Sequence, residues 1–265
     1  MSDHGKIARA FVDARRDDTL LHAYPGAMPA SLADAYRIQD RAIASDGRSI
    51  GGWKLGRIRS PEASQFGAER LAGPIFSNSI VIPENSDPVA VQVLSGFAAV
   101  EAEVLLRVSS TPPANLSTED APKFVDEVRL GIEIASSPFL GINQNGPAVT
   151  VSDFGNNFGL VVGPPIPDAM APGALDQLAE LTIDNVTVGT GLVVDMLDGP
   201  FGSLAFLARL LAERGRRLEP GQWISSGAIT GVHPVRHGQH VRATFGSGLA
   251  IECTTVPALL PESAK

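Results

Sequence analysis

The stretch GFAAVEAEVLLRV, from Gly96 to Val108, carries two glutamates inside a run that is otherwise almost entirely apolar. Its residue types alternate, which predicts a β-strand with one wholly apolar face, made of Val100, Ala102, Val104 and Leu106. The opposite face then carries Glu101 and Glu103 next to each other, together with Leu105 and Arg107. The attachment points of the two acids would lie about 6–7 Å apart. Both acids therefore point the same way, and their mutual repulsion needs an explanation.

Two explanations fit a pair of acids on one face of a strand. The first is an amphipathic strand whose wet face is solvated, with Arg107 neutralising part of the charge. The second is a divalent cation held between the two carboxylates. This stretch alone leaves both open.

Composition limits the class of protein. The chain has 265 residues, of which 44% are hydrophobic and 19% charged, as in a soluble globular protein. A formal net charge of −8 argues against a nucleic-acid partner and against an anionic membrane surface. The single cysteine, Cys253, cannot form an internal disulfide, and the first residues lack the apolar segment of a signal peptide. We therefore expect a cytoplasmic protein.

The pattern of elements changes along the chain. Residues 1–48 are expected to be mainly helical, with an apolar stripe starting at Ile7 and a second helix capped by Ser31. Residues 49–265 consist mostly of short β-like runs divided by Gly and Pro, with one amphipathic helix near residue 205 and a final hairpin turning at 246–248. No βαβ rhythm or linker is evident. The sequence predicts one α+β domain over 1–265, with a largely antiparallel β core and a helical N-terminal portion.

A third acid and a lysine lie in similar apolar settings. Glu133 stands between Ile132 and Ile134 in VRLGIEIASSPF, and Lys54 lies in GGWKLG. Three glutamates on two strands would form an all-oxygen cage for Mg²⁺ or Mn²⁺. The alternatives are three independent surface acids and a lysine that reaches solvent.

Taken in order, these segments resemble the 2-oxopent-4-enoate hydratase and 4-oxalocrotonate decarboxylase family, within the fumarylacetoacetate hydrolase superfamily. The resemblance runs from about residue 31 to residue 255. It rests on SLADAYRIQ, GWKLG, VEAEVLLRV, GIEIASSPF, TVSDFGNNFGLVVG and LARLLAERGRRLEPGQWISSGAITG. Each motif is short, but their order and spacing together are specific. The implied fold is the mixed β roll of that superfamily.

The resemblance implies a site and a reaction. Its metal ligands would be Glu101, Glu103 and Glu133, holding Mg²⁺ or Mn²⁺. The substrate would be a small 2-oxo or 2-hydroxy-enoic acid from aromatic-compound breakdown, bound by a chain that forms a homo-oligomer. The catalytic residues would be Lys54 and Asp153, and the substrate-binding residues Leu55, Asn156, Asn157 and Ser226.

Three departures from the family pattern leave the reaction open. Leu71 or Ala72 stands where the hydratases carry an acid. The lysine strand continues with residues 56–59, GRIR, in place of small hydroxyl residues, and DFGNN at 153–157 replaces a Ser-Ser pair. The first interpretation is a hydratase of a 2-hydroxy-dienoate, a carbon–oxygen lyase. The alternatives are an oxalocrotonate-type decarboxylase, an acylpyruvate hydrolase and a non-catalytic protein that binds 2-oxo acids.

Overall fold

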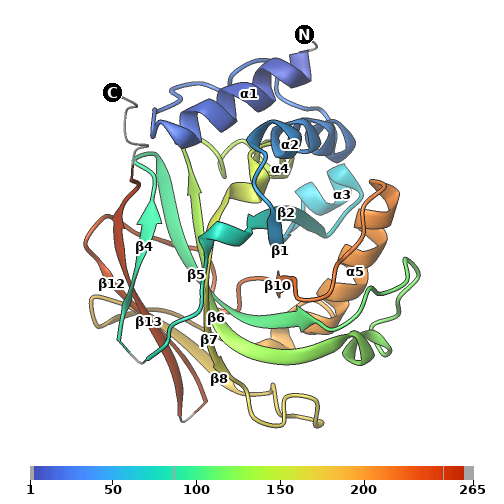
Figure 1. The fold of residues 1–265 in the computed structure, drawn as a ribbon, viewed down its shortest axis with the longest axis vertical. Helices are drawn as coiled ribbons and strands as arrows, with labels where there is room; N and C mark the ends of the chain where they lie inside the picture. The colour runs from blue at the N-terminus through green and yellow to red at the C-terminus, as the bar shows by residue number, and fades with distance from the viewer. Residues whose placement is uncertain (1–2, 86, 247, 260–265) are drawn as a thin grey trace.

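The computed structural model describes residues 3–85, 87–246 and 248–259 (Figure 1). Its helices are α1 (Asp3–Arg16), α2 (Leu32–Asp46), α3 (Glu62–Phe66), α4 (Pro147–Ser152) and α5 (Gly199–Glu213). Its strands up to the middle of the chain are β1 (Ile50–Arg57), β2 (Arg70–Phe76), β3 (Ile80–Val81), β4 (Val89–Val93), β5 (Phe97–Val108) and β6 (Val125–Ser137). The remaining strands are β7 (Asn157–Pro165), β8 (Leu178–Ile183), β9 (Val186–Leu192), β10 (Trp223–Ser225), β11 (His233–Pro234), β12 (His240–Phe245) and β13 (Leu249–Pro257).

The two N-terminal helices form as their sequence predicts. The apolar stripe of α1 is buried, including Ile7 and Phe11. Helix α2 begins at an N-cap, because the Ser31 hydroxyl accepts a hydrogen bond from the Asp34 amide at 3.1 Å. It ends at Gly47, which takes the left-handed conformation common after helices. The two helices lie together at one end of the molecule (Figure 1).

The larger sheet of the described residues has eight strands. Its order is β2-β1-β10-β5-β6-β7-β3, and the short β11 also pairs with β5. The pairs β1–β10 and β3–β7 are parallel and the other pairs are antiparallel. The long strands β5 and β6 lie near its centre, which places the glutamate segments in the middle of the sheet.

In the part of the chain that the structure describes, the second sheet has five strands in the order β4-β13-β12-β8-β9. Strands β12 and β13 form the predicted C-terminal hairpin, although Ser247 in its turn lies outside the described residues. Only the β4–β13 pair is parallel among the described strands of this sheet. The predicted α+β class with a largely antiparallel core is therefore confirmed.

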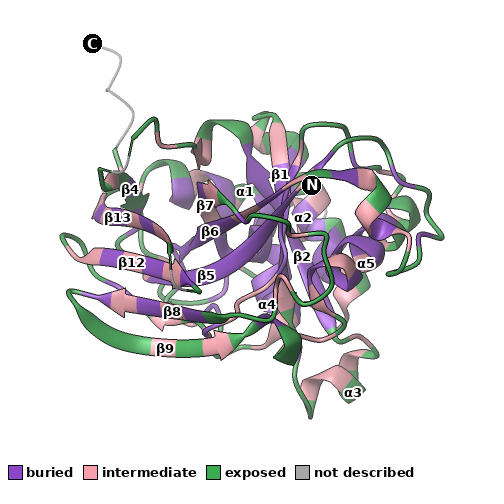
Figure 2. Cartoon of the chain, turned by 90° about the horizontal axis from the view of Figure 1, so that it is seen from below, coloured by how far each residue is buried: buried purple, intermediate pink, exposed green. Residues whose placement is uncertain are grey.

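Strand β5 is buried on both of its faces (Figure 2). The apolar face, with Val100 and Val104, belongs to the main core, and Glu101 and Glu103 on the other face are equally enclosed. No helix among the described residues has the length and apolarity needed to cross a membrane. The assignment of the whole of 1–265 to a single domain stays a prediction.

Candidate metal and substrate site

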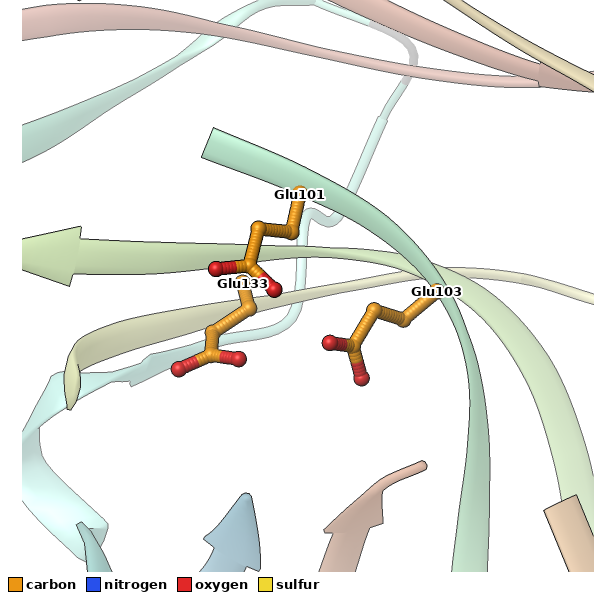
Figure 3. A group of neighbouring side chains, drawn as sticks. All are labelled: Glu101, Glu103 and Glu133. Carbon is orange, nitrogen blue, oxygen red and sulfur yellow. The ribbon is translucent and has the colours of Figure 1, made fainter. Parts of the chain in front are cut away.

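Three glutamates converge from two neighbouring strands (Figure 3). Glu101 and Glu103 extend from β5, and Glu133 on β6 lies directly opposite Glu101. One carboxylate oxygen from each residue lies within 4.8 Å of the other two. All three residues are at most 4% exposed. Like charges facing each other across two strands repel, and burial removes the screening that water would give them. This arrangement needs a counter-charge.

Lys54 on β1 supplies one positive charge. Its Nζ lies 3.2 Å from Glu133 Oε1 and donates a hydrogen bond to Asn156 Oδ1 at 3.3 Å. Burial alone would lower the pKa of Lys54, but the three nearby carboxylates raise it above its ordinary value. The Lys54 side chain is therefore an ammonium ion at neutral pH, in contact with the cluster and not with bulk solvent.

The ionised forms of two of the carboxyl groups are disfavoured by their surroundings. Burial raises the pKa of Glu101 to about 7, against the lowering effect of Lys54. Burial also raises the pKa of Glu103 well above its ordinary value, and repulsion by the other two glutamates adds to this. Two donors oppose that rise, because Glu103 Oε2 accepts hydrogen bonds from the Ser225 hydroxyl at 2.5 Å and from the Gly227 amide at 2.8 Å.

The cluster fits a divalent cation. If all three carboxylates ionise, the single Lys54 ammonium leaves two negative charges unbalanced, and the raised pKa values of Glu101 and Glu103 reflect that cost. Glu103 Oε1 and Glu133 Oε2 are buried and have no hydrogen-bond partner. Oxygen ligands that are anionic, close together and otherwise unsatisfied are the donor set that Mg²⁺, Mn²⁺ and Ca²⁺ prefer. These three residues could therefore hold such an ion.

A cavity of about 600 Å³ opens onto one side of the cluster. Much of its wall is apolar, including Ile58, Leu71, Met196, Ile229 and Val232. Five of the predicted site residues line it: Lys54, Leu55, Glu101, Asn156 and Ser226. Apolar walls with a few convergent polar groups are typical of small-molecule sites. The structure thus brings the cationic lysine, one glutamate and two polar side chains to the same cavity.

Two other predicted site residues lie behind the cavity wall. Asn157 donates from Nδ2 to Glu133 Oε1 at 3.0 Å, so it contacts the cluster and not the cavity. Asp153 is fully buried, and both of its carboxylate oxygens are engaged, by Arg15 and by the Ser137 hydroxyl. Asp153 does not line the cavity. Its predicted role in catalysis stays a prediction, and any such role is exerted through its neighbours.

Sequence reasoning missed three contacts of the site. Ser225, one residue before the predicted Ser226, is the residue that binds Glu103. Asn143 Oδ1 accepts a hydrogen bond from Asn156 Nδ2 at 3.0 Å. Arg15 reaches Asp153 from 138 residues away along the chain. Arg15 is the last residue but one of α1, and a charged residue that extends the apolar stripe of an amphipathic helix was the available signal.

The solvated-face explanation of the first motif is wrong for its glutamates. Glu101 and Glu103 are enclosed, as described above, whereas Arg107 lies at the far end of the strand. Arg107 pairs with Asp126 and Glu127 at 2.9 and 2.5 Å and has no ion pair with Glu101 or Glu103.

Known proteins are similar to this chain in sequence. The chain is 26% identical over 238 residues to 2-oxo-hept-4-ene-1,7-dioate hydratase of Escherichia coli, covering 85% of this chain and 87% of the relative. It is 24% identical over 220 residues to 4-oxalocrotonate decarboxylase of Pseudomonas putida, covering 81% and 82%. The predicted family resemblance is confirmed. No protein-family model matches the chain.

Solved structures show the same fold. One is 4-oxalocrotonate decarboxylase from Pseudomonas putida G7, complexed with calcium and acetate; it aligns with a TM-score of 0.78 and 21% identity, covering 96% of this chain and 97% of the other. A second is fumarylpyruvate hydrolase from Pseudomonas aeruginosa in complex with Mn²⁺ and pyruvate, with a TM-score of 0.58, 13% identity and coverage of 78% and 89%. The predicted fumarylacetoacetate-hydrolase-like fold is therefore confirmed.

Proposed function

We propose that this chain is a divalent-metal-dependent enzyme that acts on a small 2-oxo or 2-hydroxy-dienoic acid, in the breakdown of aromatic compounds. The observation that carries the proposal is the buried cluster of Glu101, Glu103 and Glu133, which has one ammonium, that of Lys54, beside its three carboxyl groups and adjoins a cavity. The relatives named above are enzymes, and two solved neighbours hold Ca²⁺ or Mn²⁺ together with a small carboxylic acid.

The metal ligands in this proposal are the three glutamates, with Mg²⁺ or Mn²⁺ as the native ion. When bound, such an ion supplies Lewis-acid stabilisation of negative charge on a substrate oxygen. Lys54 contributes a second positive charge at the cavity wall and binds the acid end of the substrate. Asn156 holds the Lys54 ammonium in place by a hydrogen bond. Leu55 and Ser226 line the same cavity.

Hydration is the first candidate reaction. It requires negative charge to develop on the 2-oxygen of the acid, which Lys54 would stabilise, and then a base that activates water. Decarboxylation is the second candidate, and one observation favours it. It needs the same stabilisation of a dienolate and a proton donor but no base for water. The family resemblance puts Leu71 or Ala72 at the position of the hydratase acid; neither can act as a base, and Leu71 is an apolar part of the cavity wall.

Several broader features complete the proposal. The chain would be cytoplasmic and homo-oligomeric, with a small acid as its ligand and no nucleic-acid or membrane partner. Cys253 is a free, buried thiol, which suits a reducing compartment. The residues 1–265 would act as one catalytic domain, in which the β-rich part binds the metal.

Metal binding tests the proposal first. Chelator-treated protein is titrated with Mg²⁺ and with Mn²⁺ by calorimetry, and Glu103→Gln serves as the matched variant because it keeps the side-chain size and removes one charge. We expect the wild type to bind and the variant to bind at least about tenfold more weakly. If the folded wild type binds neither ion, the proposal is wrong.

The reaction is tested next with 2-hydroxy-dienoates and 4-oxalocrotonate in the presence of either ion. Loss of the dienol absorbance is followed in a spectrophotometer, and products are separated to distinguish hydrated acid from released CO₂. Hydrated product supports the hydratase, and CO₂ supports the decarboxylase. Binding of oxalate without turnover of any of these acids would favour a non-catalytic protein that binds 2-oxo acids.

A further inference from the structure

Arg15 is a buried arginine that connects helix α1 to the loop behind the site. It is 6% exposed, and its Nε and Nη2 bind the two carboxylate oxygens of Asp153 at 2.5 and 2.9 Å. The same guanidinium donates to the Asn157 carbonyl at 2.8 Å and to the Ser136 carbonyl at 2.9 Å. Bidentate arginine–carboxylate pairs fix geometry as well as charge. Arg15 therefore holds both ends of the segment 153–157.

That segment has an unusual backbone. Phe154, Gly155 and Asn156 have φ angles of 54°, 64° and 59°, so three successive residues lie in the left-handed region. For a bulky residue such as Phe154 this conformation is a genuine outlier. This region is unfavourable for non-glycine residues, and such conformations persist only where surrounding contacts impose them. Arg15 contacts the chain on both sides of the three residues, at Asp153 and at Asn157.

The left-handed loop presents two amides to the site. Asn156 Oδ1 accepts the hydrogen bond from Lys54, and Asn157 Nδ2 donates to Glu133 Oε1. One amide therefore orients the cation and the next orients a carboxylate of the cluster. In an extended loop, successive side chains would point in opposite directions, and the two contacts could not both form as they do here.

We propose that Arg15 is a positioning residue for the site: by clamping Asp153 and the Asn157 carbonyl, it keeps the intervening residues 154–156 left-handed, so that Asn156 and Asn157 hold Lys54 and Glu133. Its consequence for turnover rests on the function proposed above, whereas its consequence for the loop does not. The competing explanation is that Arg15 only docks helix α1 onto the core. In that case a different substitution that loosens α1 to the same extent would have the same effect on the loop and on ligand binding.

The test compares Arg15→Met and Arg15→Lys with Phe11→Leu. Phe11 lies one turn before Arg15 in α1, is fully buried and packs against Tyr24, so its variant loosens the helix without removing the clamp. The first readout is hydrogen exchange of the backbone amides of Asn156 and Asn157 in metal-free protein. We expect exchange to be about tenfold faster in Arg15→Met than in Phe11→Leu, when the two variants are compared under conditions that give them the same thermal stability.

The second readout is calorimetry with Mg²⁺ and then with oxalate. We expect Arg15→Met to weaken one or both affinities by about tenfold, as is usual when a residue that orients a ligand is removed. Arg15→Lys should recover only part of the loss, because an ammonium cannot reproduce the bidentate pair. If Arg15→Met does not fold, the comparison of Arg15→Lys with Phe11→Leu decides.

Equal exchange and equal affinities in the Arg15 variants and Phe11→Leu would overturn the proposal and leave Arg15 as a helix anchor. A wild type that binds neither Mg²⁺ nor oxalate would refute the proposed function instead. The exchange measurement on the metal-free loop would still test the role of Arg15.

Discussion

At the residue scale, Lys54 lies between the glutamate cluster and the cavity in which an acid ligand would bind. Its ammonium contacts Glu133 on one side and lines the cavity on the other. A ligand carboxylate entering the cavity brings another negative charge to a site already rich in them. Without Lys54 that charge would face Glu101 in a partly desolvated wall, where repulsion is much stronger than in water.

Lys54→Met should therefore weaken binding of a 2-oxo acid more than binding of metal. The substitution keeps the length and apolar stem of the side chain and removes the charge. We expect oxalate or pyruvate affinity to fall by about tenfold or more, corresponding to the loss of one charge-assisted hydrogen bond. Calorimetry with each ligand on the metal-saturated protein measures this. Equal oxalate affinity in the variant and the wild type would show that Lys54 serves only to neutralise the cluster.

The family resemblance implies a catalytic role for Asp153, which as a carboxylate could be the base that hydration needs, but its surroundings predict a different result for Asp153→Asn. The carboxylate is bound by Arg15 and Ser137, and the residue does not line the cavity. We expect the variant to slow ketonisation and hydration of 2-hydroxypentadienoate by similar factors, because the loop that orients Lys54 is disturbed. Separate rates for the two steps, from dienol loss and from product formation, test this. Selective loss of hydration would instead identify Asp153 as the base.

At the element scale, strand alternation was enough to place the glutamates but not to say what covers them. The pattern around Glu101 and Glu103 correctly gave a strand and the face that the two acids share. Alternation cannot show that β1, β10 and the loop after α4 enclose that face, because these elements are distant in sequence. For the same reason Arg15 and Ser225 were missed, whereas Lys54 and Glu133 were found from their own apolar strands.

The pairing of β1 with β2 places loop 153–157 close to strand β1, which carries Lys54. Gly73 on β2 lies opposite Lys54 in register, and a Cβ at Gly73 would lie 2.0 Å from the Phe154 carbonyl oxygen. Since the obstructing atom belongs to the backbone, it cannot move away as a flexible side chain would. The close approach of β2 to the loop therefore requires glycine at this position.

Gly73→Ala should displace the loop from Lys54. We expect a loss of about 1–3 kcal/mol in the free energy of unfolding, typical of overpacking, together with weaker oxalate binding. Gly248→Ala is the matched control, because a Cβ there meets nothing within 4 Å and the residue lies in the distant hairpin. Chemical denaturation and calorimetry on both variants measure the two effects. Full oxalate affinity in Gly73→Ala would mean that the loop position is not needed for acid binding.

At the scale of the whole molecule, the glutamate cluster sits on the two longest strands of the larger sheet, β5 and β6, so its charge state affects the stability of the entire fold. In the metal-free chain the pKa of Glu101 is about 7, raised by burial from an ordinary value of 4.5. Between these two pH values the folded chain binds more protons than the unfolded chain. The free energy of unfolding from this group therefore falls as the pH rises from about 4.5 to about 7.

The contribution of Glu101 should thus make metal-free protein less stable at pH 7.5 than at pH 5.5 by roughly 2 kcal/mol, since about 1.5 pH units of the shifted range lie above pH 5.5. Glu101→Gln removes the Glu101 titration and also the repulsion that Glu101 exerts on Glu103, so the difference between the two proteins, measured by thermal unfolding across this range, reports these two carboxyl groups together. A divalent cation replaces the missing proton: at about 100 times its Kd it should add about 2.7 kcal/mol to the wild type at pH 7.5. The Glu101→Gln variant should gain less stability from the cation than the wild type gains. If the wild type and Glu101→Gln show the same pH dependence, and Mg²⁺ and Mn²⁺ stabilise neither, then the cluster does not hold a cation and its charges are balanced within the protein.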